Sequence, residues 1–256
     1  MNEIAAPRST RWKAPPEWTL LDMLLIVGIS VLATIALSAV LGIGLRVLGP
    51  GDAREMIRDY PVVASAVAGS AIYGAFLLVT YFRVVRRTAA GWSGLGFRAP
   101  PLLPMVLSPL LVLGQLIAVA ITQQIVISII GEFENPQIEA LSAGQGFTWL
   151  NFILMLLLAG VIAPVVEEVL FRGLLYRWLR FRLPLLMAVL LSAVIFAAAH
   201  VILPLMPVLF VVGVLLALAY EFSGSLWLPI LLHAMQNSLA VSLIFFALAV
   251  DLPLTQ

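Results

Sequence analysis

Val165-Val-Glu-Glu-Val-Leu-Phe-Arg-Gly-Leu-Leu-Tyr176 places two adjacent carboxylates and an arginine within an otherwise apolar stretch of the chain. On a helix, Glu168 and Arg172 are four residues apart and share one face, so they can pair, whereas Glu167 points roughly 100° away from them. One turn further along its own face Glu167 finds only apolar residues. Because unpaired ionisable side chains within a membrane are rare and costly, Glu167 is a candidate functional group.

The whole chain is too apolar for a soluble domain. Its 256 residues are 62% hydrophobic and 11% charged, with a mean hydropathy of +1.11, which is typical of a helical membrane protein that crosses the bilayer several times. No basic block with interleaved aromatic residues is present, so we expect no nucleic-acid partner. The chain has no cysteine, which excludes thiolate catalysis and cysteine-type zinc sites. Its chemistry must come from carboxylates, amides, hydroxyls or the two histidines.

Apolar segments of membrane-spanning length predict an all-α transmembrane helical bundle of about seven spans, within a range of six to eight. A polar tail precedes the first span, and the fourth span, at about 30 residues, is long enough to protrude from the bilayer. The expected spans are Leu20 to Leu45, Val62 to Phe82, Leu102 to Ile130, Trp149 to beyond Arg172, Pro184 to Val201, Pro207 to Tyr220 and Leu226 to Val250.

The distribution of basic residues predicts the orientation of the bundle. For seven spans, 11 of the 14 lysines and arginines fall in the N-terminal tail and in the loops on the same side of the membrane. Because basic residues concentrate on the cytoplasmic side, we expect a cytoplasmic N-terminus and an outside C-terminus. The localisation we expect is a bacterial cytoplasmic membrane, with the lipid bilayer as the surrounding partner.

Two further polar motifs lie in the last spans. In Phe196-Ala-Ala-Ala-His200 the phenylalanine and the histidine share one helix face, and the three alanines allow another helix to approach closely. If the fourth and fifth spans form an antiparallel hairpin that turns near Pro184, His200 lies at the height of Glu167. The same reasoning about a turn near Gly224 brings His233 and Asn237, which share a face of the last span, within about one turn of that height.

Prolines precede two of these groups. Pro164 comes just before Glu167, and Pro229 comes just before His233. A proline within a helix removes a backbone hydrogen bond, so we predict a local irregularity of the helix at both positions.

Each polar group also has a purely structural interpretation. A lone histidine or asparagine in a membrane helix most often forms a hydrogen bond between helices. The same interpretation applies to Gln115, Gln123 and Gln124 of the third span, for which the alternative is that they line a substrate groove. Four unpaired polar groups at one predicted height, including both histidines of the chain, favour a functional site.

The motifs Glu167-Glu168-x-x-x-Arg172, Phe196-x-x-x-His200 and His233-x-x-x-Asn237, in this order, resemble those of the CPBP family of intramembrane proteases. That family includes CAAX prenyl proteases and bacteriocin-processing or Abi proteins, and the resemblance covers about Phe147 to Val250. It implies that residues 1–146 form a tail and three variable transmembrane helices, and that residues 147–256 form a protease core of four transmembrane helices. It also implies an endopeptidase that acts on a membrane-anchored protein or peptide; the oligomeric state is not predicted.

The resemblance further implies a role for each motif residue. Glu167 and His200 would hold and deprotonate a water molecule, while His233 and Asn237 would donate hydrogen bonds to the oxyanion. Glu168 and Arg172 would support Glu167, and Phe196 would pack against the ring of His200.

A zinc-dependent version of the same protease would use Glu167, His200 and His233 as metal ligands, with Glu168 as the base. The chain has no His-Glu-x-x-His helix, so we favour a mechanism with neither metal nor cofactor. Two rivals from other classes are a proton-coupled transporter and a non-catalytic membrane scaffold or immunity protein of the same fold. A transporter would be expected to show paired half-repeats with broken helices, which the sequence does not show.

Overall fold

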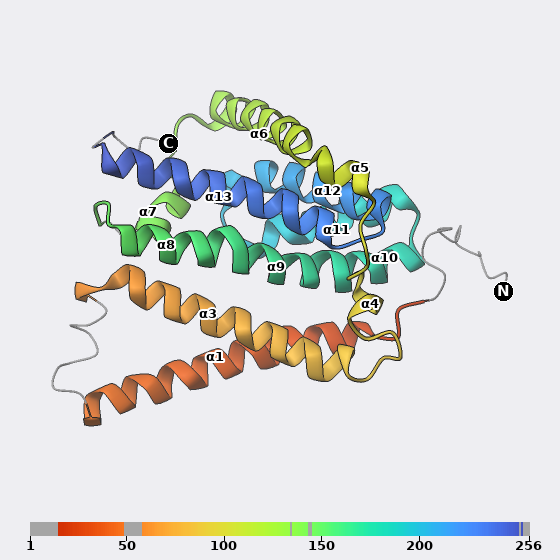
Figure 1. Ribbon diagram of the computed structural model, residues 1–256, viewed down its shortest axis with the longest axis horizontal. Helices are drawn as coiled ribbons and strands as arrows, with labels where there is room; N and C mark the ends of the chain where they lie inside the picture. Colours follow the sequence, from red (N-terminus) through yellow and green to blue (C-terminus); the bar gives the residue numbers. More distant parts are fainter. Residues whose placement is uncertain (1–14, 49–57, 134, 143–144, 251, 253–256) are drawn as a thin grey trace.

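The computed structural model describes residues 15–48, 58–133, 135–142, 145–250 and 252, which are mostly helical and contain no strand (Figure 1). The predicted tail up to residue 14, and most of the connection between the first two spans, lie outside the described residues. Within these described residues, six helices are long and apolar enough to cross a membrane, and a seventh apolar helix is shorter. The predicted all-α transmembrane bundle is therefore confirmed.

The helices follow the expected spans closely. The long ones are α1 (Leu20–Leu48), α3 (Pro61–Thr80) with its π-helical extension η1 (Tyr81–Val85), α6 (Ser108–Ile130), a rod over Trp149–Arg182, α12 (Met206–Ser223) and α13 (Trp227–Ala249). The shorter apolar helix is α11 (Leu185–Ala199), and small elements are α4 (Gly91–Leu95), α5 (Leu102–Val106), α7 (Pro136–Ser142) and the 3-10 turn η4 (Leu203–Leu205). The expected third span is divided at Leu107, because Pro109 cannot donate to the carbonyl of Met105 and so ends α5.

The rod consists of five consecutive helical segments: α8 (Trp149–Leu157), η2 (Leu158–Ile162), α9 (Ala163–Glu168), η3 (Val169–Tyr176) and α10 (Arg177–Arg182). At the α-helical rise of 1.5 Å per residue its 34 residues would span about 51 Å, well beyond the ~30 Å of a bilayer core. The expected length of this helix is confirmed, and its protrusion from the bilayer stays a prediction. The segments η2 and η3 are π-helical, and such widened turns are frequent at functional sites.

The two prolines behave differently. Pro164 is the second residue of α9, which directly follows the π-helical segment η2, so the predicted irregularity is present there. For Pro229 the prediction was wrong, because this residue lies in the first turn of α13, where a backbone N–H has no partner within the helix anyway.

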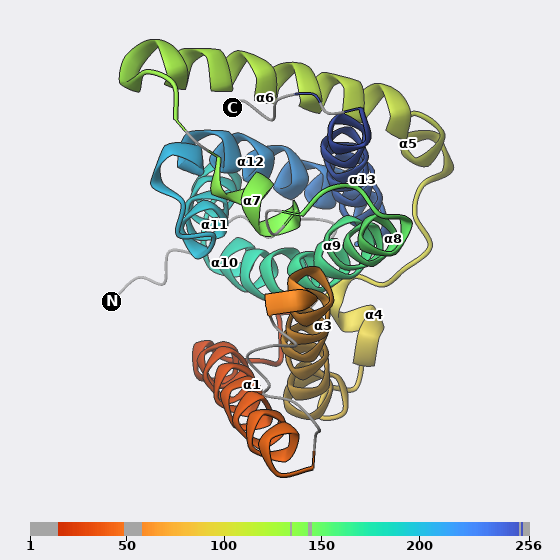
Figure 2. The same cartoon turned by 90° about the vertical axis from the view of Figure 1, so that its left-hand side faces the viewer.

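The helices form two groups. Viewed nearly along the rod, α1 and α3 lie together below, while α8 to α13 form a cluster above them (Figure 2). Helix α6 crosses the top of this cluster and packs against α12 and α13. Helix α3 joins the two groups because it packs both on α1 and on the rod at α8, η2 and α9. It is therefore the N-terminal element that comes nearest to the paired glutamates.

Small residues bring α11 and α12 into close contact. Gly213 of α12 lies against the backbone of Ala193 in α11, so closely that a Cβ atom on Gly213 would be 2.9 Å from the Cα atom of Ala193. Ala193 and Ala197 are both buried. This approach fixes the height of His200, which follows the last residue of α11, relative to α12.

Candidate active site

The two adjacent glutamates have different surroundings. The Glu168 side chain is fully buried, and its Oε1 accepts a hydrogen bond of 2.8 Å from Nη1 of the equally buried Arg172, so the predicted ion pair is confirmed. Glu167 instead lines a cavity, where it lies beside Tyr73 and the two histidines. The helix geometry thus separates a paired carboxylate from one that faces open space.

Glu167 meets both histidines of the chain. Its Oε2 is 3.9 Å from Nε2 of His200 and 3.9 Å from Nε2 of His233. The hairpin argument that placed His200 at the height of Glu167 is therefore confirmed. Both separations exceed a direct hydrogen bond, which leaves Oε2 without a hydrogen-bond donor among the described residues. Where two polar atoms are this far apart, a water molecule is the natural bridge.

The partner of each Nδ1 atom fixes the tautomer of both histidines. Nδ1 of His200 lies 2.8 Å from the carbonyl oxygen of Phe196, and Nδ1 of His233 lies 2.9 Å from Oε1 of Glu168. Since a carbonyl and a carboxylate oxygen can only accept, each Nδ1 carries a proton. In the neutral rings, Nε2 therefore directs a lone pair towards Glu167.

Glu168 connects the ion pair to His233. Its Oε1 accepts from both Arg172 and His233, while Nη2 of Arg172 donates to the carbonyl of Gly213 at 3.1 Å. The pair with Arg172 followed from spacing along one helix. The contact with His233 depends on the packing of α13 against the rod, which no periodicity within one helix predicts.

Phe196 lies among the charged and aromatic groups of this network. Its ring centroid is 4.9 Å from that of His200, which confirms the predicted contact, and 5.9 Å from that of His233. The guanidinium of Arg172 lies over the same ring at 4.4 Å, a cation–π arrangement, and Phe171 contacts it edge-on. One phenylalanine thus restrains both histidine rings and the arginine.

Asn237 contacts the widened turn η2. Its Nδ2 donates to the carbonyl of Ala159 at 3.1 Å, and the neighbouring Ser238 donates to the carbonyl of Gly160 at 3.3 Å. Pro164 lies five residues after Ala159 and four after Gly160, and it has no N–H to donate to either carbonyl. Side chains of α13 therefore satisfy the backbone groups that Pro164 leaves open. Asn237 keeps a second N–H for another acceptor.

Several of the side chains described above line one cavity of about 690 Å³. The four predicted catalytic residues, Glu167, His200, His233 and Asn237, are all on its wall. Amide side chains line it as well: Gln123 and Gln124 from α6, and Gln236 from α13. Of the two interpretations of the glutamines, lining of a groove is the better description of Gln123 and Gln124. Gln115 instead forms an interhelical hydrogen bond to Gln236. A cavity with converging polar groups and apolar walls is typical of a ligand site.

Comparison with known proteins gives a family match for the part of the chain that carries most of this site. Residues 149–239 match the model of the family described as type II CAAX prenyl endopeptidase Rce1-like. This part of the chain is therefore similar to CPBP-type proteases. YdiL of Bacillus subtilis, a proposed membrane peptidase, is 30% identical over 88 residues, which are 34% of this chain and 36% of the relative. The chain thus matches about a third of the length of that curated relative, and no solved structure matches the chain significantly.

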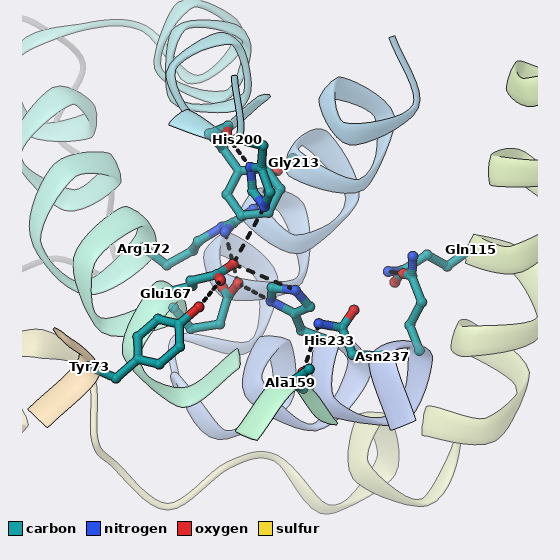
Figure 3. Close-up of polar contacts among 12 residues, drawn as sticks. Tyr73, Gln115, Ala159, Glu167, Arg172, His200, Gly213, His233 and Asn237 are labelled. Carbon is teal, nitrogen blue, oxygen red and sulfur yellow. Dashed lines mark hydrogen bonds and ion pairs between the residues drawn. The ribbon is translucent and has the colours of Figure 1, made fainter. Parts of the chain in front are cut away.

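Tyr73, which lies on the cavity wall and outside the residues that match the family, was missed by the sequence reasoning. It belongs to α3, and its hydroxyl donates to Oε1 of Glu167 at 3.3 Å (Figure 3). A weak signal for it exists, since Ser65, Gly69 and Tyr73 recur every four residues and line one face of α3 towards the cavity. The side chains that contact Glu167 therefore come from both halves of the chain.

Proposed function

We propose that this protein is an intramembrane endopeptidase that hydrolyses peptide bonds of membrane-anchored proteins or peptides with a glutamate-activated water. The match to the Rce1-like family supports a CAAX-type intramembrane protease. The observation that carries the proposal is the convergence of two histidine Nε2 atoms, each 3.9 Å away, on the unpaired Oε2 of a cavity-lining glutamate. This arrangement suits a general base that holds a nucleophilic water.

In the first step a water molecule would lie between Oε2 of Glu167 and Nε2 of His200. Glu167 takes one proton from the water as its oxygen forms a bond to the carbonyl carbon of the scissile peptide. The carbonyl oxygen becomes an oxyanion. His233, protonated on Nε2 with Glu168 as its counter-ion, and the free N–H of Asn237 would donate hydrogen bonds to it.

In the second step the carbon–nitrogen bond breaks. Glu167 passes its proton to the departing nitrogen, and the products are a carboxylic acid and an amine, which exchange one proton to become a carboxylate and an ammonium group. The same carboxylate thus serves first as base and then as acid.

The amide side chains of the cavity would hold the substrate by its main chain. A peptide that leaves water for the membrane must find partners for its N–H and C=O groups. Gln123 and Gln124 have both a donor and an acceptor to offer, and they occupy the wall contributed by α6. Such contacts are independent of the substrate side chains. They therefore suit an extended segment of varied sequence.

A zinc mechanism fits the described residues less well. Tetrahedral zinc with ligand bonds of about 2.0–2.1 Å holds its ligand atoms roughly 3.4 Å apart, whereas both Nε2 atoms are 3.9 Å from Oε2 of Glu167. If Glu167 were a ligand, Glu168 would have to act as the base. Glu168 is fully buried and already accepts from Arg172 and His233. We therefore expect activity of the purified protein to survive EDTA; loss with EDTA that zinc alone restores would contradict this.

The chain is a multi-pass integral membrane protein, as its six long apolar helices indicate. For its placement we propose a bacterial cytoplasmic membrane with the N-terminus in the cytoplasm. The absence of cysteine makes this directly testable, because a single cysteine at Ser9 would be the only thiol of the chain. An impermeant maleimide should label it in inside-out vesicles and not in spheroplasts. The opposite labelling would reverse the orientation.

The decisive experiment for the function is the substitution Glu167→Gln. We expect it to abolish cleavage and to leave thermal unfolding in detergent unchanged, because the side chain keeps its size and loses only its basic oxygen. Membrane peptides that accumulate in a Glu167→Gln strain would identify the substrates. Glu132→Gln, at an exposed position outside the cavity, is the matched control and should be fully active. Unchanged cleavage and an unchanged membrane peptide profile in the Glu167→Gln strain would favour a non-catalytic scaffold.

A further inference from the structure

The two oxygens of the Glu167 carboxylate have different surroundings. Oε1 accepts the hydrogen bond from Tyr73, whereas Oε2 faces the two histidines and accepts no hydrogen bond from the described residues. The terminal torsion of a glutamate is broad and roughly two-fold, so an unrestrained carboxylate would rotate and exchange its oxygens. A donor fixed on one oxygen holds the other in a constant direction.

Tyr73 is well placed to act as this fixed donor. It belongs to a helix of 20 residues, and one turn before it Gly69 lets α3 approach the rod closely. A Cβ atom on Gly69 would be 2.7 Å from a terminal methyl of Leu158, the first residue of η2. Because Gly69 has no Cβ atom, α3 lies close enough to the rod for the phenol of Tyr73 to reach Glu167 on α9.

We propose that Tyr73 is a positioning residue for Glu167, and that α3 thus contributes a residue to the active site. The phenol holds Oε1, so that Oε2 is kept aimed at the water between Glu167 and His200. Its effect passes entirely through Glu167, and the inference rests on the proposed function of that residue. Because the family match covers only residues 149–239, a contribution from α3 lies outside what the match describes.

The test is the substitution Tyr73→Phe, which removes one hydroxyl and keeps the ring. Tyr60→Phe is the matched control, since Tyr60 caps the same helix and its side chain is exposed. Both proteins, reconstituted in liposomes, would be assayed with two probes: the membrane peptides that accumulate in the Glu167→Gln strain, and a quenched fluorescent farnesylated peptide. We expect Tyr73→Phe to lower kcat by about 10- to 100-fold, the usual effect of losing a partner that orients an active-site group, with KM within twofold. Tyr60→Phe should match the wild type.

The outcomes separate this inference from the function it rests on. Wild-type kcat in Tyr73→Phe with an inactive Glu167→Gln variant would overturn the role of Tyr73 and leave the protease proposal intact. A raised KM with unchanged kcat would also overturn it, because Tyr73 would then bind substrate rather than orient the base. Full activity of Glu167→Gln would overturn both. A fall in kcat accompanied by a lower unfolding temperature in detergent would assign Tyr73 to helix packing, contrary to the proposal.

Discussion

Nδ1 of His233 lies 2.9 Å from Oε1 of Glu168, on the opposite side of the imidazole from the nitrogen that faces Glu167. The two glutamates point in different directions on their own helix, yet His233 of α13 lies next to both of them, with Nδ1 at Glu168 and Nε2 at Glu167. Carboxylates that hold the far nitrogen of a working histidine fix its tautomer and its orientation. Glu168 therefore contributes to the site through His233 and to the fold through Arg172.

Glu168→Gln should unfold more readily than the wild type, in contrast to Glu167→Gln. The substitution leaves the guanidinium of Arg172 buried without its counter-charge, and breaking a buried pair in this way costs about 3–5 kcal/mol. Thermal unfolding of the two purified variants in the same detergent measures the difference. Equal stability would mean that the pair does not contribute to the fold.

Replacing both partners should separate stability from activity. In Glu168→Met/Arg172→Met no unpaired charge remains, so most of the stability lost in Glu168→Gln should return. His233 would still lack the acceptor for its Nδ1 proton. We therefore expect a folded protein with little cleavage, measured as unfolding temperature and kcat side by side. Wild-type turnover in this double variant would show that Glu168 serves the fold alone.

Asn237 and Ser238 offer a matched pair for the oxyanion role. Both donate to carbonyls of η2, but only Asn237 lines the cavity. Asn237→Ala should lower kcat by about 100- to 1,000-fold, the usual effect of losing one oxyanion donor. Ser238→Ala removes a comparable helix contact and should cost about 0.5–1.5 kcal/mol of stability with near-normal kcat. Similar kcat values in the two variants would argue against the oxyanion role.

Gly213→Ala should disturb the site without touching the cavity. The added methyl group would lie 2.9 Å from the Cα atom of Ala193, so α11 and α12 must move apart, and the carbonyl that receives Arg172 moves with them. Overpacking of this kind costs about 1–3 kcal/mol. We expect lower stability and a reduced kcat. The control is Gly114→Ala, whose Cβ atom would meet nothing within 4 Å and should have no effect.

The parts of the site that could be predicted are those that depend on one helix or one tight turn. The Glu168–Arg172 pair follows from helical spacing, and the meeting of Glu167 with His200 follows from a hairpin whose turn at Pro184 is short. The prediction that His233 and Asn237 lie near the height of Glu167 could also be made, because α12 and α13 are joined by a short turn at Gly224. Helices that are adjacent in sequence leave little freedom of register.

The parts that could not be predicted depend on helices that are distant in the sequence. Tyr73 is 94 residues from Glu167, and nothing in the pattern of α3 says which helix its small-residue face will meet. The donation from His233 to Glu168 likewise depends on how α13 turns about its own axis. In a lipid environment such rotations are set by close packing of small residues, which hydrophobic periodicity does not report.

Helix α11 has a consequence for the membrane itself. Its 15 residues extend about 22 Å, short of the ~30 Å that a bilayer core requires, and His200 follows its last residue. Lipids beside a helix that is too short adapt by local thinning. The hydrophobic barrier would then be shallowest next to His200, so the mismatch between this one helix and the lipid would shorten the path by which water reaches a hydrolytic site.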